Sequence, residues 1–301
     1  MKKLSTQLCL LLLSLILPAA AQAQRLFDQQ APLPQQYFEN RYLGNPALAG
    51  ADTGLSLSMA YRKAWKETNG APVSFALTGD YQLMRTLGVG LTVFNDQAGP
   101  LKQTRVAMSY AYHTPLDEDR TEFLHVGATI SLDNKRVEKS KPGIPEEPAL
   151  KGYTGYKNAI GADLGIAYTN RNLTLQATMP DVTRTFENID EKEPRGQSTF
   201  AVTASYKFGT KSYKISSIEP LVSLRVMKGS QSVVDAGAKV SFARNLVNVF
   251  GLYHTNKAVT GGVGFQFKNS IQVQASYTNQ RGGLDAYGGN FGLGIKVRLF
   301  N

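Results

Sequence analysis

Three histidines, His113, His125 and His254, are the side chains of this sequence best suited to acid–base or metal chemistry. They are scattered among segments of strand character, without the close His or Cys spacing of a metal site. No Gly-x-Ser-x-Gly nucleophile elbow occurs, although folding can still assemble a Ser-His-Asp set from distant residues. We therefore expect a protein that is not an enzyme and that has no metal or cofactor.

Two glycine-containing elements have the composition of ligand sites. Gly88-Val89-Gly90 resembles the start of a dinucleotide-binding loop, but it lies inside a strand-like run and opens no helix. Close strand packing or a bend in a sheet explains these glycines better. Asn95 and Asp96, followed by Gly99, indicate either a hairpin turn with Asx hydrogen bonds or an oxygen cluster for Ca²⁺, and the turn is the commoner use.

Residues 1–23 have the pattern of a secretory signal peptide. Lys2 and Lys3 precede an apolar run, and Ala21-Gln22-Ala23 matches the cleavage consensus. Cys9, the single cysteine, falls within this leader. The mature chain is therefore expected to contain no disulfide and no reactive thiol.

The mature sequence is basic. Removing Lys2 and Lys3 leaves 31 of the 33 basic residues against 23 acidic ones. A basic balance often indicates nucleic-acid binding, but export and the lack of a Lys/Arg cluster with interleaved aromatics argue against it. We expect no nucleic acid among the partners, and we assign the charge to solvated loops and a polar lumen.

The elements that position these residues are strands. From Phe291 to Leu299, apolar residues alternate with glycine, lysine and arginine, which is the period of a β-strand. Similar runs predict strands over 53–62, 72–82, 86–95, 102–113, 120–133, 158–169, 172–178, 196–208, 213–228, 231–242, 246–255, 258–268, 270–280 and 288–300. Most have the length that a tilted strand needs to cross a bilayer, whereas strands of a secreted β-sandwich, the alternative, are usually shorter.

Connections that alternate between long and short favour the same architecture. The gaps at 63–71, 134–157 and 179–195 are long, and those at 83–85 and 170–171 are short. Outer-membrane barrels have short periplasmic turns and longer outer loops. The sequence therefore predicts an all-β, transmembrane antiparallel β-barrel of about 14 strands in the cell outer membrane.

The chain is expected to have three parts: signal peptide 1–23, an N-terminal periplasmic, plug-like segment 24–52, and the barrel 53–301. The middle part contains prolines that discourage strand pairing, among them Pro32 and Pro34, yet also aromatic residues that favour burial. We expect it to fold into or across the periplasmic mouth of the barrel.

Four motifs resemble the PorP/SprF family of the type IX secretion system of Bacteroidetes-type bacteria. The family patterns are Q-Y-x-x-N, N-P-A-x-A-G, Y-R-x-x-W and G-x-G-x-x-x-x-N-D-x-x-G. The candidate partner-binding residues on them are Gln36, Tyr37, Asn40, Asn45, Pro46, Ala47, Gly50, Arg62, Trp65, Asn95, Asp96 and Gly99. The chain departs from the commonest pattern at Arg41-Tyr42, where many relatives have Asn-Pro, so the role of that turn is less well supported by the resemblance.

This resemblance implies a non-enzymatic component of protein secretion and gliding motility that helps export, bind or anchor a cognate secreted surface protein. It implies three kinds of partner: the cargo protein, a periplasmic or OmpA-like secretion-system partner, and outer-membrane lipid. An outer-membrane pore or small-ligand transporter is the alternative function. The barrel pattern alone is compatible with both.

Loop and lumen residues complete the expectations. In the long gap 134–157, we expect contacts to the cargo from Lys135, Arg136, Lys139, Lys141, Tyr153 and Tyr156. Arg62 falls on the polar face of its strand, so it is expected in the lumen, either paired with a carboxylate or binding cargo. Trp65 is assigned to an interfacial aromatic belt, with the barrel mouth as the alternative.

Overall fold

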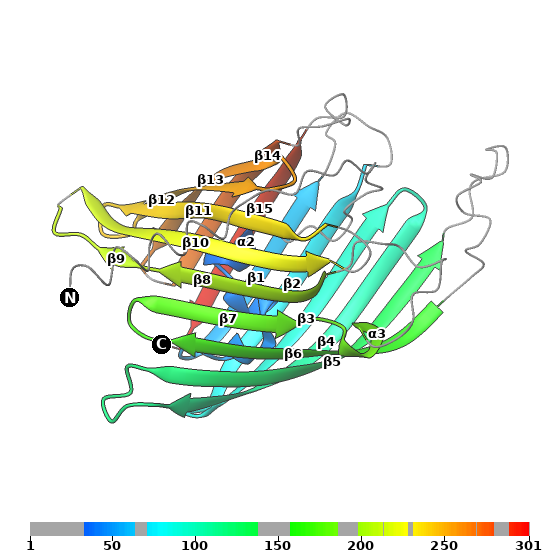
Figure 1. Cartoon of the computed structure of the whole chain (residues 1–301), viewed down its shortest axis with the longest axis horizontal. Helices are drawn as coiled ribbons and strands as arrows, with labels where there is room; N and C mark the ends of the chain where they lie inside the picture. The colour runs from blue at the N-terminus through cyan, green and yellow to red at the C-terminus, as the bar shows by residue number, and fades with distance from the viewer. Residues whose placement is uncertain are drawn as a thin grey trace.

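Antiparallel strands pair into one closed wall. A computed structural model describes residues 33–63, 71–137, 157–185, 198–212, 214–227, 231–268, 270–279 and 289–300. The strands are β1 (Leu55–Lys63), β2 (Val73–Met84), β3 (Leu87–Ala98), β4 (Leu101–Pro115), β5 (Phe123–Val137), β6 (Lys157–Thr169), β7 (Leu173–Met179), β8 (Ser198–Tyr206), β9 (Phe208–Gly209), β10 (Ile215–Met227), β11 (Val233–Phe242), β12 (Val247–His254), β13 (Val259–Phe267), β14 (Ile271–Asn279) and β15 (Asn290–Leu299). Pairing of β10 with β11 joins the two ends of the sheet (Figure 1).

All fourteen predicted strand segments are present. The two-residue β9 continues the path of β8 and pairs with the same neighbour, β10, so the two together correspond to the predicted segment 196–208. Boundaries shift by a few residues, most of all in β5, which spans Phe123–Val137 where the sequence predicts 120–133. The predicted transmembrane barrel of about 14 strands is confirmed.

Most strands present mainly apolar side chains outward and polar ones inward, although Leu221 of β10 and Phe250 and Leu252 of β12 pack inside the barrel with Tyr37 and Phe38. In β15, Phe291 and Ile295 are exposed to 46% and 38%, whereas Lys296 on the opposite side is only 5% exposed. In β1, Leu57 is exposed and Ser56 is buried. Since successive side chains of a strand point to opposite faces, one wall serves both the lipid and a polar interior.

The two ends of the barrel differ in their connections. At one end, which we call the short-turn end, the turns at 85–86, 170–172 and 243–246 are brief. At the other, the long-loop end, residues 138–156 connect β5 to β6. By the rule for outer-membrane barrels, the short-turn end is the periplasmic one.

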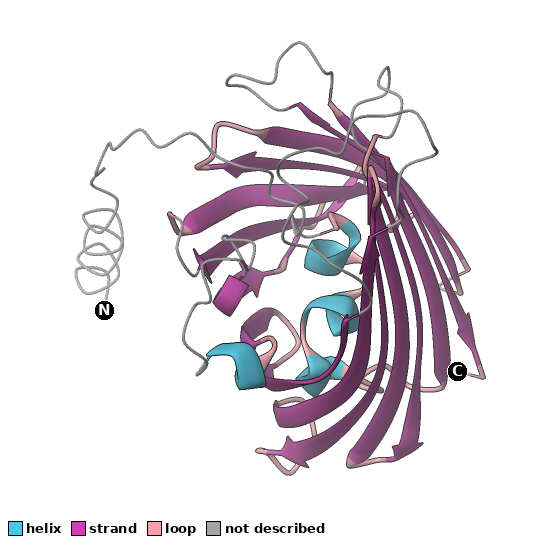
Figure 2. Ribbon diagram, turned by 90° about the vertical axis from the view of Figure 1, so that its right-hand side faces the viewer, coloured by secondary structure: helices cyan, strands magenta, loops and turns pink. Residues whose placement is uncertain are grey.

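Short helices lie inside the strand wall, as Figure 2 shows. They include α2 (Gln35–Phe38), η1 (Arg41–Gly44) and η2 (Pro46–Leu48), which precede β1, while α3 (Val182–Thr185) follows β7. None of the helices in the described part of the chain has the length and apolar character needed to cross a membrane.

Candidate functional site in the barrel lumen

Residues 33–52, which we call the lumen segment, run through the barrel interior. Leu33 packs with Ala60, in the half of β1 nearer the long-loop end. At the other end of the segment, the backbone N–H of Gly50 donates to Asp80 Oδ2 at 3.1 Å, close to the short-turn end of β2. The segment therefore extends from the periplasmic mouth into the outer half of the barrel.

Two asparagines shape the lumen segment. Asn40 precedes η1 and Asn45 precedes η2, and each side-chain oxygen accepts a backbone N–H of the helix that it caps. Pro46 at the start of η2 has no amide hydrogen to leave unpaired. Gly50 follows with a φ of +64°, a backbone conformation that favours glycine. The Asn45-Pro46 motif therefore forms a capped helical turn that is followed by a left-handed glycine.

The same asparagines attach the segment to the wall. Asn45 Nδ2 donates to the carbonyl oxygens of Ile166 in β6 and Ala177 in β7, at 3.2 and 3.3 Å. Asn40 Nδ2 donates to Thr78 Oγ1 at 2.8 Å. Each buried amide thus serves a helical turn with its oxygen and the wall with its NH₂ group, which an aspartate at the same position lacks.

Glycines on the inner face of β3 make room for the lumen segment. A Cβ atom added to Gly88 would lie 1.9 Å from the carbonyl oxygen of Ala49, and one added to Gly90 would lie 2.4 Å from the ring of Tyr42. The hydroxyl of Tyr42 in turn donates to Ser109 Oγ at 3.0 Å. These glycines permit a close approach, as expected, but the approach is between the wall and the lumen segment.

Two further glycines extend this contact to the neighbouring strands. A Cβ atom on Gly127 of β5 would lie 2.6 Å from the backbone of Ala47, and one on Gly165 of β6 would lie 2.0 Å from Asn45 Oδ1. The Asn45-Pro46-Ala47 motif is therefore seated against backbone, with no side chain between it and the wall.

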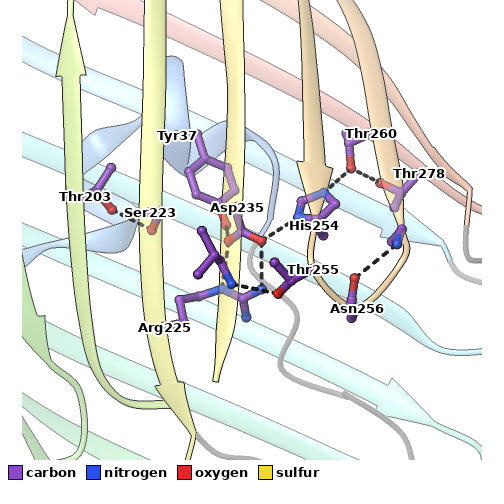
Figure 3. Close-up of polar contacts among 12 residues, drawn as sticks. Tyr37, Thr203, Ser223, Arg225, Asp235, His254, Thr255, Asn256, Thr260 and Thr278 are labelled. Carbon is purple, nitrogen blue, oxygen red and sulfur yellow. Dashed lines mark hydrogen bonds and ion pairs between the residues drawn. The ribbon is translucent and has the colours of Figure 1, made fainter. Parts of the chain in front are cut away.

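A buried carboxylate joins the lumen segment to the opposite wall, as Figure 3 shows. The hydroxyl of Tyr37 donates to Asp235 Oδ2 at 2.5 Å, and Arg225 Nε donates to the same oxygen at 3.0 Å. His254 Nδ1 donates to the other carboxylate oxygen at 2.6 Å. We call these four residues the Asp235 cluster. Asp235 is 0% exposed, so its charge depends on these partners for compensation.

Asp235, His254 and Thr260 stand in the order of a hydrolase triad. His254 Nε2 lies 2.8 Å from Thr260 Oγ1, and this hydroxyl also lies 2.8 Å from the hydroxyl of Thr278. Thr260 is only 2% exposed, so a substrate carbonyl has no access to it. The arrangement instead matches a buried polar network whose members satisfy one another.

His113 and His125 form a second buried pair, on adjacent strands. His113 Nε2 donates to the carbonyl oxygen of Ala49 at 3.1 Å, so its Nδ1 is left to accept the Nδ1–H of His125 at 2.7 Å. His125 Nε2 then accepts the hydroxyl of Thr169 at 2.8 Å. Both neutral rings are fully satisfied. No group of three or more His, Cys, Asp or Glu suited to a metal ion occurs within the described ranges.

Arg62 lies on the lumen side of β1, as expected. Its Nη2 donates to Ser74 Oγ at 2.9 Å, and that hydroxyl donates to Asp96 Oδ1 at 2.5 Å. The predicted carboxylate neighbour is therefore Asp96, reached through a serine of the intervening strand.

The predicted turn at Asn95 and Asp96 is wrong. Both residues belong to β3, because its ladder with β4 continues as far as the pair Ala98 and Leu101. The turn comes later, at Gly99 and Pro100, and Gly99 has the left-handed φ of +55°. Alternation alone does not show where a strand that protrudes beyond the bilayer ends.

A cavity of about 810 Å³, which we call the vestibule, lies between the lumen segment and the short-turn end. Two ion clusters line it: Glu219 with Arg41 at 2.6 Å and Lys239 at 2.9 Å, and Asp52 with Lys296 at 2.8 Å and Arg298 at 3.2 Å. Glu39 also lines the vestibule, and neither of its carboxylate oxygens has a hydrogen-bond partner in the described part. Burial raises the pKa of Glu39 to about 7.

The remaining predicted residues fall in two groups. Gln36 is half-buried in α2, and Lys135 and Arg136 are half-buried at the long-loop end of β5. Outside the described residues lie Trp65, Lys139, Lys141, Tyr153 and Tyr156. Sequence reasoning did not single out Glu219, Arg225 and Asp235. The signal that could have found them is a charged residue at an inward-facing position of a predicted strand.

A closed antiparallel wall that is apolar outside, polar inside and short-turned at one end defines an outer-membrane β-barrel protein. Residues 26–295 match the family described as type IX secretion system membrane protein PorP/SprF, and the chain belongs to that family. The resemblance carried by the four sequence motifs is thereby confirmed.

Solved barrels of low sequence identity show a partial likeness. The outer membrane protein Omp33 of Acinetobacter baumannii has a TM-score of 0.49 and 9% identity, over 83% of this chain and 100% of that one. The toluene transporter TodX of P. putida has a TM-score of 0.49 and 10% identity, over 85% of this chain and 93% of that one. No match was found among curated proteins.

Proposed function

We propose that the protein is a non-enzymatic outer-membrane component of the type IX secretion system that helps export, bind or anchor a cognate secreted surface protein. The observation that carries this proposal is the lumen segment. Its capped turns, its seat on wall glycines and the Asp235 cluster occupy the interior that a diffusive pore would keep open. Membership of the family supplies the secretion system.

The two ends of the barrel suit two kinds of partner. The connections 63–71, 134–157 and 179–195 would hold the cargo, with Lys135 and Arg136 at the base of the longest one. The short-turn end, together with residues 24–52, would meet a periplasmic partner, for which the family resemblance suggests an OmpA-like protein. In this view the lumen segment acts as a plug that separates the two faces.

Conductance and capture distinguish this proposal from an outer-membrane pore or small-ligand transporter. The purified protein in a planar bilayer should show little steady conductance, while crosslinking in the native cell should capture a secreted surface protein. Steady conductance without any captured cargo would favour the pore instead.

The loop between β5 and β6 gives the sharper genetic test. Deleting residues 138–152 should abolish surface retention of the cargo while the barrel stays folded and heat-modifiable on gels. A variant with those residues replaced by a Gly/Ser linker of equal length separates the loss of specific contacts from the loss of loop length. Normal cargo display in both variants would exclude this loop as the docking site.

A further inference from the structure

The charges that line the vestibule are unevenly distributed. The lining contains eight basic side chains and four acidic ones. The basic residues are Arg41, Arg85, Arg120, Arg171, Lys207, Lys239, Lys296 and Arg298, and the acidic ones are Glu39, Asp52, Asp80 and Glu219. The excess of positive charge faces a cavity that opens at the periplasmic end, because its rim is formed by exposed residues of the short turns.

The deep cations are held in ion pairs and the rim cations are not. Glu219 and Asp52 each hold two of the inner cations in ion pairs. At the rim, four exposed cations form no side-chain ion pair or hydrogen bond with any residue in the described ranges. These rim cations are Arg85, Arg120, Arg171 and Lys207. They come from the β2–β3, β4–β5 and β6–β7 turns and from the residue between β8 and β9, so they line one arc of the opening.

Side-chain amides make up much of the remaining wall. Asn170, Asn172, Asn245, Asn248, Gln272 and Gln274 are among the lining residues. An amide side chain offers both a donor and an acceptor, which are the groups that a polypeptide backbone requires. Few apolar side chains line the cavity, so it offers little to an acyl chain.

We propose that the vestibule binds an acidic polypeptide segment presented from the periplasm. The rim cations would attract and hold its carboxylates, and the amide wall would satisfy its backbone. The cavity is of the size that encloses a ligand, sufficient for a few residues of extended chain and too small for a folded domain. The inference deepens the proposed function, on which its biological meaning rests, by naming the chemistry of the segment that the periplasmic partner inserts.

Binding to the purified full-length barrel in detergent tests this inference. A short labelled poly-glutamate peptide should bind, and its affinity should fall as ionic strength rises, whereas poly-glutamine of equal length should bind weakly or not at all. Changing the four rim cations to glutamine, Arg85→Gln with Arg120→Gln, Arg171→Gln and Lys207→Gln, should weaken poly-glutamate binding by about tenfold or more.

The chain offers a matched control. Lys211, Lys214, Arg244 and Lys268 are exposed cations of the same short-turn end that do not line the vestibule. Changing these four to glutamine removes the same charge and should alter binding by less than about threefold. Equal losses in the two variants would overturn the inference in favour of a diffuse surface attraction.

Competition separates the sources of negative charge. Inorganic phosphate and phosphatidylglycerol micelles, at matched total charge, should displace the peptide poorly. Full displacement by either, or no peptide binding by the unaltered protein, would overturn the inference. Surface retention of cargo in cells is scored separately: a rim variant that loses peptide binding but retains cargo supports the vestibule as a peptide site and disconnects it from the proposed secretion role.

Discussion

The phenol of Tyr37 donates a hydrogen bond of 2.5 Å to the carboxylate of Asp235, 198 residues further along the chain. One partner belongs to the lumen segment and the other to β11, so this bond fixes the segment to the wall far from the strand that it precedes. Burial and the negative charge of Asp235 raise the pKa of Tyr37 well above its ordinary value, which keeps the phenol protonated as the donor.

Removing this hydroxyl should loosen the lumen segment. Tyr37→Phe leaves Asp235 with Arg225 and His254, so the barrel should stay folded while docking of the segment weakens by about 1–3 kcal/mol. Hydrogen exchange over residues 33–52 should accelerate correspondingly. Tyr253→Phe, on an outward-facing tyrosine that is 55% exposed, is the matched control and should change nothing.

Filling the space at a wall glycine should displace the segment more strongly. Gly88→Ala places a methyl group 1.9 Å from the carbonyl oxygen of Ala49, and a backbone contact of this kind cannot move aside alone. We expect docking to weaken by about 1–3 kcal/mol, seen as faster protease cleavage within the segment and a rise in bilayer conductance. Gly261→Ala meets no atom within 4 Å and serves as the control. Equal protease resistance in the two variants would contradict the proposed seat.

Docking of the lumen segment should depend on pH through Glu39. Its pKa is raised from 4.5 to about 7 by burial, with Lys296 and Lys239 acting in the opposite direction. A carboxyl group whose pKa is raised in the docked state holds its proton more tightly there than in the undocked chain. It therefore stabilises the docked state fully when the pH is below its undocked pKa, and this stabilisation is lost as the pH rises through its docked pKa. Protection of the segment should therefore decrease between about pH 5 and pH 8.

Glu39→Gln isolates this contribution, because it keeps the shape of the side chain and removes the titration. The His113–His125 pair would act in the opposite sense, since protonating either ring disrupts their shared hydrogen bond on acidification. The contribution of Glu39 is therefore given by the difference between the unaltered protein and Glu39→Gln in the pH dependence of lumen-segment hydrogen exchange. If hydrogen exchange of the segment has the same pH profile in both, Glu39 is not the controlling group.

Arginine substitutions on the outer face should show where along the strands the bilayer lies. Ile130, near the middle of β5, is 68% exposed, and Ile130→Arg should cost about 2–4 kcal/mol of folding stability. Leu116, in the short turn after β4, is 53% exposed, and Leu116→Arg should cost about 0–1 kcal/mol. Urea-dependent unfolding in lipid vesicles measures both. Equal penalties would show that the predicted position of the bilayer on the wall is wrong.

The strands and their faces were readable from the sequence because their signal is local. Alternation from Phe291 to Leu299 places Ile295 outward and Lys296 inward, and the structure agrees. The family motifs were also contiguous, so the element that contains Asn45 and Pro46 could be recognised before its surroundings were known. Each of these inferences needs only neighbours in the chain and the period of two of a strand.

The tertiary structure alone decided what the motifs contact. His113 meets His125 through the register of β4 and β5, Gly88 meets Ala49 only because the lumen segment enters the barrel, and Tyr37 reaches Asp235 only because the sheet closes. Alternation assigns each side chain to a face but does not set the stagger between strands or the path of a chain inside the lumen. The stagger and the path inside the lumen depend on closure of the whole wall. Closure is the sum of many weak strand pairings, so no single position of the sequence indicates it.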